Sequence, residues 1–185
     1  MKVSPINSHY VNMKFEDISA QPCAGNKSVD ILMLIKSAAK NSQNRVLLRT
    51  MWLDQTYLSR VSAKVKYAFL IGTKQFPSIP SHLLEEAREH NDLILMDYVD
   101  NVYRNNTYKT MGSMKWTLEN CPQARYIALL DDDLFVNVKN LARFLRDPAK
   151  YPKAVTKHSG FEAGSTTELY AGKARPVEKF RPHSK

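Results

Sequence analysis

Four short apolar runs give the strongest constraint on how this chain folds. They are VDILMLIKS (29–37), KYAFLIG (66–72), DLILMDYV (92–99) and ARYIALL (124–130), and a segment with helical spacing follows each. Strands that are apolar along their whole length are typical of sheets covered by helices on both faces. Strands alternating with helices predict βαβ units and a largely parallel sheet. We therefore expect an α/β fold.

The segments after the runs show the helical periodicity. They cover residues 40–52, 81–90, 107–121 and 137–147. In the first three, the residues that share a helical face are Val46, Leu47, Thr50 and Met51; Leu83, Leu84 and Ala87; and Met111, Met114, Leu118 and Cys121. In the fourth, Asn137 is expected to cap the helix, with Leu141, Phe144 and Leu145 pointing inward.

The chain has 185 residues, which is the usual size of one domain. We expect a polar lead-in segment at residues 1–28 and an α/β core at residues 29–148. Residues 149–185 are richer in glycine, proline and basic side chains, and no closing helix follows. We interpret them as the start of an incomplete region.

The charge balance favours anionic partners. Lysine and arginine number 27 against 18 acidic residues, a net charge of +9. These charges are spread out, and no recognition motif accompanies them, so a nucleic-acid-binding module is not expected. The longest apolar run, Ile31–Ile35, is far shorter than the roughly 18 residues of a membrane span. The N-terminal residues lack the apolar core of a signal peptide.

Cys23 and Cys121 are the only cysteines. They have no neighbours at metal-ligand spacing, which excludes a zinc site built on cysteines, and two residues do not make a disulfide-rich scaffold. The residues alone leave two alternatives open, one disulfide bridge or two buried free thiols.

Three consecutive carboxylates, Asp131, Asp132 and Asp133, follow the fourth apolar run directly. Ligands of open α/β sheets bind at the carboxyl ends of the strands. Carboxylate oxygens at such an edge suit Mg²⁺ or Mn²⁺, which in turn bind a diphosphate. The alternative is a solvated acidic turn.

Basic residues at three positions are further candidates for a phosphate site. Arg45 and Arg49 are four residues apart and therefore project from one helical face. Guanidinium groups bind phosphate or stack on a base, although an exposed basic helix face has the same spacing. Lys109 stands near the start of the third helical segment, where it meets either a phosphate or solvent.

Four blocks in order resemble glycosyltransferase family 31, the β-1,3-galactosyltransferase and β-1,3-N-acetylglucosaminyltransferase family. They are the first strand with Arg49-Thr50-Met51-Trp52, the YAFLIG strand, the block from DLILMDYVDNVY to KTMGSMKWTLENC, and ARYIALLDDDLFVN. The first block departs from the family's R-x-T-W, and Leu130 stands where the family often has another residue type. The resemblance covers about residues 29–147.

This resemblance implies a GT-A-like, Rossmann-like fold, apparently truncated, that binds a nucleotide sugar. It implies a hexosyltransferase that transfers galactose or N-acetylglucosamine from a UDP-sugar to a glycan acceptor on a glycoprotein or glycolipid, with a β-1,3 linkage and inversion. Asp131 and Asp133 match the ends of the family's metal-binding DxD motif. Asp132 is placed toward the nucleotide ribose, and Arg45, Arg49 and Lys109 match basic positions near the donor.

The resemblance also implies Mn²⁺ (or Mg²⁺), a Golgi membrane location on the luminal side, and hence a more credible Cys23–Cys121 bridge. The catalytic base is unknown and is expected beyond residue 185, in the acceptor-side region. A homologue that binds UDP or a partner without catalysis is the main alternative. A haloacid-dehalogenase-type phosphohydrolase fits less well, because there the acidic motif follows the first strand and here it follows the fourth run.

Overall fold

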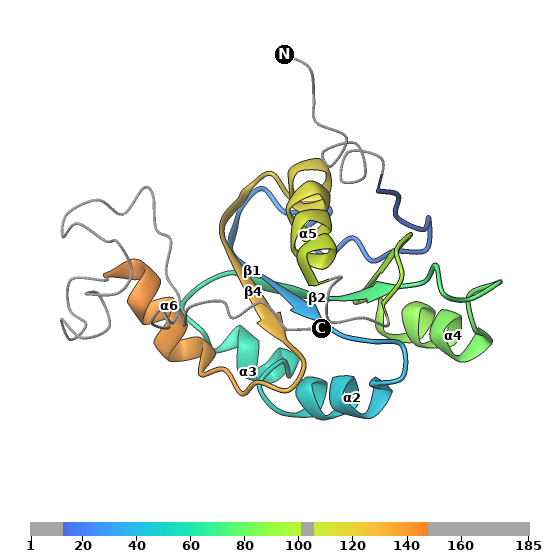
Figure 1. Cartoon of the computed structure of the whole chain (residues 1–185). Helices are drawn as coiled ribbons and strands as arrows, with labels where there is room; N and C mark the ends of the chain where they lie inside the picture. The colour runs from blue at the N-terminus through green and yellow to red at the C-terminus, as the bar shows by residue number, and fades with distance from the viewer. Residues whose placement is uncertain (1–12, 101–105, 148–185) are drawn as a thin grey trace, which may run out of the picture. The chain divides into compact units, whose positions relative to one another are not determined.

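The computed structural model describes residues 13–100 and 106–147. Within them, four strands form one sheet in the order β3-β2-β1-β4, and every pair of neighbours is parallel. The strands are β1 (Val29–Lys36), β2 (Val65–Gly72), β3 (Leu93–Met96) and β4 (Ala124–Asp131). The expected α/β architecture, a Rossmann-like parallel sheet with flanking helices, is confirmed (Figure 1).

Helices cover both faces of this sheet. The helices α2 (Ser42–Thr50), α3 (Gln55–Ser59) and α4 (Ser81–His90) lie on one face, and α5 (Asn106–Asn120) lies on the other (Figure 1). Because β1 and β2 are buried from both sides, residues 31–35 and 68–71 are less than 2% exposed. None of the described helices is long and apolar enough to span a membrane.

A further helix, α6 (Val138–Arg146), belongs to a second compact unit that begins at Asn137. The Asn137 side chain accepts a hydrogen bond from the Asn140 backbone N–H, at 3.0 Å, which confirms the predicted cap. Of the predicted inward residues, Leu145 is buried, while Leu141 and Phe144 are half-buried. Residues 149–185, the predicted start of an incomplete region, all lie outside the described residues.

The lead-in segment contributes to the interior from residue 13 onward. Met13, Ala20 and Cys23 are buried, and the Ala20 N–H donates to the Leu93 carbonyl at 2.8 Å. Cys23 forms a disulfide with Cys121, with the two Cα atoms 5.5 Å apart, which decides between the two alternatives for the cysteines. The bridge fastens this segment to the end of α5.

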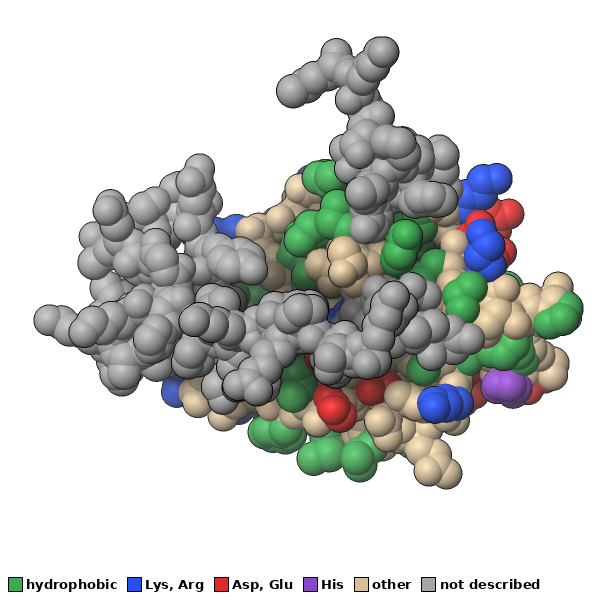
Figure 2. Space-filling view, viewed as in Figure 1, with side chains coloured by type: hydrophobic (Ala, Val, Ile, Leu, Met, Phe, Trp, Pro, Cys, Tyr) green, Lys and Arg blue, Asp and Glu red, His purple; other side chains and the backbone are tan. Residues whose placement is uncertain are grey.

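Two helices bury polar residues and expose their apolar faces. On α2, Arg45 and Leu48 are buried, whereas Val46, Leu47 and Met51, the residue after the helix, are about half exposed. On α5, the buried residues include Lys109, Ser113, Trp116 and Thr117, whereas Met111, Met114 and Leu118 are exposed. Figure 2 shows hydrophobic side chains at the surface over both helices. The face shared by apolar residues is thus not the buried face, because charged side chains on the opposite face find buried partners.

Candidate donor-binding site

The carboxyl ends of the neighbouring parallel strands β1 and β4 lie side by side at the same end of the sheet. The connection from β1 leads through α2 toward β2 on one side, while β4 pairs with β1 on the other side. Such a switch in strand order opens a crevice outside the carboxyl ends, and ligands of open α/β sheets bind there. Ser37 directly follows β1, and Asp132 and Asp133 directly follow β4. The predicted acidic site therefore lies at the switch point.

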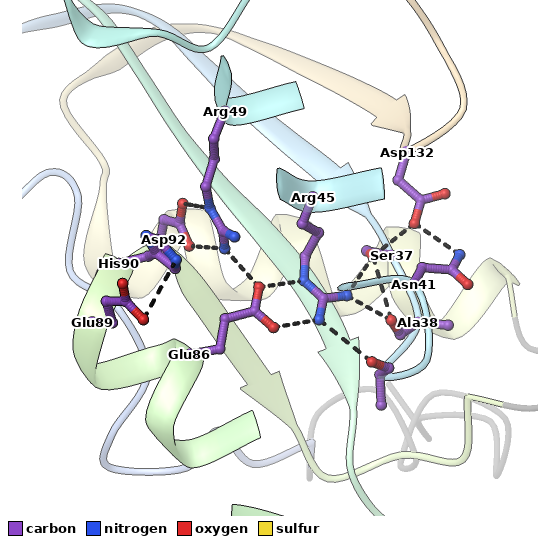
Figure 3. Close-up of polar contacts among 11 residues, drawn as sticks. Ser37, Ala38, Asn41, Arg45, Arg49, Glu86, Glu89, His90, Asp92 and Asp132 are labelled. Carbon is purple, nitrogen blue, oxygen red and sulfur yellow. Dashed lines mark hydrogen bonds and ion pairs between the residues drawn. The ribbon is translucent and has the colours of Figure 1, made fainter. Parts of the chain in front are cut away.

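Asp132 connects the two strand ends. Its Oδ2 accepts a hydrogen bond from Ser37 Oγ at 2.7 Å and one from Asn41 Nδ2 at 2.9 Å (Figure 3). Asp131 forms an ion pair with Lys36, its register partner on β1, with 2.9 Å between Nζ and Oδ1. The Asp131 and Asp133 side chains are exposed. The middle aspartate is thus fixed, and its two neighbours face solvent.

The three aspartates do not by themselves enclose a cation. Among residues 13–100 and 106–147, no group of three or more His, Cys, Asp or Glu side chains is placed to hold a metal ion. Mg²⁺ in nucleotide-dependent enzymes is held by one or two carboxylates, with phosphate oxygens and waters as the other ligands. Two exposed carboxylates on either side of a fixed third fit that type of site.

Arg45 lies at the buried end of the same cluster. Its Nε and Nη2 donate to the two oxygens of Glu86, at 2.7 and 2.6 Å. Its Nη1 donates to Ser37 Oγ at 3.0 Å and to the Ala38 carbonyl at 2.7 Å, and Nη2 also reaches the Ala39 carbonyl at 3.4 Å. A guanidinium has five N–H donors. All five are engaged, so no donor of Arg45 remains for a phosphate.

Arg49 lies one turn further along α2. It donates to both oxygens of Asp92, each at 2.8 Å, and to Glu86 Oε1 at 2.8 Å (Figure 3). Its guanidinium also stacks over the Phe69 ring, 5.1 Å from the centroid. Two arginines and two carboxylates thus form a charge-balanced, largely buried network between α2, α4 and the start of β3. The alternative interpretation of Arg45 and Arg49 as an exposed basic helix face is therefore wrong.

The charges in this network shift one another's protonation. Burial works to raise the pKa of Glu86, but the hydrogen bonds and charges of Arg45 and Arg49 hold it below its usual 4.5. Burial lowers the pKa of Arg49, yet Asp92 and Glu86 outweigh it and the pKa is raised. Burial, with the charge of Asp92, raises the pKa of Tyr67 to about 12. Glu86 and Arg49 therefore stay ionised at neutral pH.

Lys109 reaches the end of β1 from α5, on the opposite face of the sheet. Its Nζ donates to the Ser37 carbonyl at 2.5 Å and pairs with Asp100 Oδ1 at 2.6 Å. Asp100 also accepts from the Tyr98 hydroxyl and the Gly72 N–H, at 2.7 and 3.2 Å. Burial lowers the pKa of Lys109 more than Asp100 raises it. Lys109 is thus a buried residue at the strand end.

The sequence pattern missed the partners of these basic residues and of Asp132, which are Ser37, Asn41, Glu86, Asp92 and Asp100. One signal was available for Glu86. It lies three residues after Leu83, one of the two buried residues of α4, and therefore on the inward side of that helix. A buried arginine needs a carboxylate, and Glu86 is the acidic residue of α4 in that position.

The sequence is similar to those of known galactosyltransferases and N-acetylglucosaminyltransferases. The sequence profile of the family described as Galactosyltransferase matches residues 43–173, more than half of the chain. A lactosylceramide 1,3-N-acetyl-beta-D-glucosaminyltransferase A from Danio rerio is 33% identical over 127 residues, which are 66% of this chain and 33% of that protein. Beta-1,3-galactosyltransferase 1 from Mus musculus is 30% identical over 154 residues, 83% of this chain and 45% of that protein.

The chain thus spans between a third and just under half of the length of these curated relatives. The profile match includes α2 with its two arginines, the Lys109 helix and the three aspartates. The chain belongs to the galactosyltransferase family, glycosyltransferase family 31.

Proposed function

We propose that this chain forms the donor-binding part of a UDP-dependent hexosyltransferase that makes β-1,3 linkages with inversion, and that its donor is UDP-galactose or UDP-N-acetylglucosamine. The observation that carries the proposal is the position of Asp132. This carboxylate is fixed at the switch point by Ser37 and Asn41, so that Asp131 and Asp133 stand on either side of it at the edge where nucleotides bind. The family's named members act on the same two sugars.

Asp132 has an arrangement suited to a hydroxyl group of the donor. Ser37 and Asn41 both bond to Oδ2. Within the described part of the chain, no hydrogen bond reaches the other oxygen, Oδ1. We assign that oxygen to a ribose hydroxyl, because a carboxylate oxygen held in place accepts a hydroxyl proton at little entropic cost.

Asp131 and Asp133 are the residues that would hold a divalent cation, Mn²⁺ or Mg²⁺. Asp131 now has Lys36 as its counter-charge, and a divalent ion would compete with or adjoin this lysine. A bound divalent ion supplies stabilisation of the negative charge that develops on the departing diphosphate. The protein's own part is to present these two oxygen ligands next to the fixed Asp132.

Two of the three basic residues, Arg45 and Lys109, hold the backbone of this site in our proposal. Arg45 has no donor left for a phosphate, and it grips the Ser37–Ala39 backbone instead. Arg49 is engaged with Asp92 and Glu86 through Nε and Nη2, while its buried Nη1 has no hydrogen-bond partner in the described part of the chain. Lys109 fixes the Ser37 carbonyl. We therefore propose that Arg45 and Lys109 hold the donor site in shape, and that Arg45 does not contact the diphosphate directly.

The disulfide supports a location in the secretory pathway, consistent with a luminal Golgi enzyme. Disulfides form and persist in oxidising compartments and are rare in the cytosol. The Cys23–Cys121 bridge ties the segment before β1 to the end of α5. The acceptor, a glycan on a glycoprotein or glycolipid, belongs to the same proposal.

A thermal-shift experiment with UDP, with and without Mn²⁺, tests the proposal. A ligand at 100 times its Kd stabilises a protein by about 2.7 kcal/mol, which corresponds to a rise in Tm of roughly 5–10 °C at this chain length. We expect the rise with UDP and Mn²⁺ together. The D131A/D133A variant should lose it, while D17A, which removes an exposed carboxylate in the lead-in segment, should keep it.

Two outcomes would contradict the proposal. One is a folded parent chain with no shift, and the other is a D131A/D133A variant with the shift of the parent. Release of UDP from a UDP-hexose then separates a transferase from a homologue that binds UDP without catalysis.

A further inference from the structure

Glu86 holds both arginines of α2 at once. Its Oε1 accepts from Arg45 Nε at 2.7 Å and from Arg49 Nη2 at 2.8 Å, while its Oε2 accepts from Arg45 Nη2 at 2.6 Å. The two contacts to Arg45 form a bidentate pair, which fixes the plane of the guanidinium as well as its position. The Glu86 side chain is only 11% exposed. Glu86 therefore determines the direction of Nη1, the guanidinium nitrogen of Arg45 that does not contact Glu86.

That nitrogen holds the start of the β1–α2 loop. Arg45 Nη1 donates to Ser37 Oγ and to the Ala38 carbonyl, at 3.0 and 2.7 Å. Ser37 Oγ, which accepts from Arg45, has one proton to donate, and it donates this proton to Asp132 at 2.7 Å. Arg45 thereby directs the Ser37 hydroxyl toward Asp132. Figure 3 shows the continuous series from Glu86 through Arg45 and Ser37 to Asp132.

The other carboxylate of the network does not take part in this series. Asp92 bonds to Arg49 through both oxygens, and the bonds of Arg49 lead to Glu86 and Asp92. The Asp92 residue is 5% exposed, comparable with the 11% of the Glu86 side chain. Asp92 and Glu86 thus stabilise the same buried network, but Glu86 alone of the two contacts Arg45.

We propose that Glu86 is a positioning residue of the donor site: through Arg45 it holds the Ser37–Asn41 loop and the orientation of Asp132 that a UDP-sugar requires. This inference rests on the proposed function, since it assigns Glu86 to the same site. Glu86 does not touch the nucleotide in this account. Its effect travels through two side chains, Arg45 and Ser37, and its removal should loosen the loop before it unfolds the chain.

Three matched variants of the full chain test the inference. E86Q keeps the size of the side chain but places an amide NH₂ donor against one of the arginine N–H donors, where Glu86 has an acceptor oxygen. D92N makes the equivalent change at the carboxylate that contacts Arg49 and not Arg45. E85Q changes the exposed neighbouring glutamate on the same helix. E86Q and D92N both weaken the buried network, so a purely structural role of Glu86 would make them behave alike.

Two measurements on these variants are required. The first is hydrogen–deuterium exchange of a peptide covering residues 36–45, where the Ser37, Asn41 and Arg45 backbone N–H groups are hydrogen-bonded. The second is the Kd of UDP in the presence of Mn²⁺ at a temperature where every variant is folded. For E86Q we expect exchange about tenfold faster and a Kd about tenfold weaker, the loss expected for a charge-assisted hydrogen bond. For D92N and E85Q we expect both values within about twofold of the parent.

The outcomes are separable. Equal effects of E86Q and D92N, or unchanged exchange in E86Q, overturn the positioning role. If E86Q does not fold, E86D takes its place, because it keeps the charge and shortens the side chain. E86D should then show the same changes in exchange and Kd to a smaller degree. An E86D variant with the exchange and Kd of the parent overturns the positioning role as well. If the loop loosens in E86Q while the parent binds no UDP with Mn²⁺, the proposed function fails, and the contact from Glu86 to the loop remains.

Discussion

The buried pair between Lys109 and Asp100 permits a quantitative test of how the end of β1 is held. Lys109 Nζ lies 2.6 Å from Asp100 Oδ1, and the two side chains are 9% and 7% exposed. The variants K109M and D100N each remove one charge while keeping a side chain of similar size. Their combination removes both charges together. The interaction energy is then obtained from a double-mutant cycle.

The magnitude follows from the distance and the burial. Two unit charges at 2.6 Å attract by about 6 kcal/mol at an effective dielectric constant of 20, before the cost of burying both groups is subtracted. Removing one partner of a buried pair typically costs about 3–5 kcal/mol. D100N leaves Lys109 without its counter-charge and should cost about that much. K109M should cost less, because Asp100 keeps the Tyr98 hydroxyl and the Gly72 N–H.

Urea denaturation followed by circular dichroism measures the four free energies of unfolding. We expect the double variant to be destabilised by at least about 2 kcal/mol less than the sum of the two single variants. The replacement of both charges leaves no ion without a partner, whereas each single change does. Additivity within about 0.5 kcal/mol would refute the reasoning, since it would mean that the two charges do not stabilise each other.

Three further predictions concern stability. Loss of the Cys23–Cys121 bridge, which closes a loop of 98 residues, should cost about 4–5 kcal/mol, measured on reduced and oxidised chains; equal midpoints would contradict it. Because the pKa of Glu86 is lowered in the folded state, its contribution to stability is complete above pH 4.5 and is lost as the pH falls through the folded-state pKa. The urea midpoint of E86Q should therefore decline less on acidification than that of the parent. G72A should cost about 2 kcal/mol more than G112A, because a Cβ at Gly72 meets backbone at 2.6 Å and one at Gly112 meets flexible methionine ends; equal costs by thermal denaturation would contradict it.

The sheet was predictable from local pattern because its strands are apolar without interruption. The runs at 29–37 and 124–130 correspond to β1 and β4 within one residue at either end. The third run is an exception, because the strand ends at Met96 and the predicted segment continued to residue 99. Helix α3 was not predicted, although Asp54 gives a cap signal by accepting the Tyr57 N–H at 2.8 Å. Five residues are too few for helical periodicity to show.

The site was less predictable, because its contacts join residues far apart in the sequence. The spacing of Arg45 and Arg49 correctly placed them on one face of α2 and predicted nothing about what that face meets. Glu86 and Asp92 lie about 40 residues further along the chain and approach only when α4 packs beside α2. Apolar periodicity then indicated the wrong inward face, since charges that are paired and hydrogen-bonded are also found in the interior.

Ser37 is the residue where the two polar clusters meet, and each reaches it from a different face of the sheet. Arg45 approaches from α2 and bonds to its hydroxyl, while Lys109 approaches from α5 and bonds to its carbonyl. Both cations are buried, and each is neutralised by an acid on its own side of the sheet. A single residue at the end of β1 is thus held at both of its polar groups, and its hydroxyl proton is directed to Asp132. For that reason we expect alterations on either face to affect donor binding through the same residue.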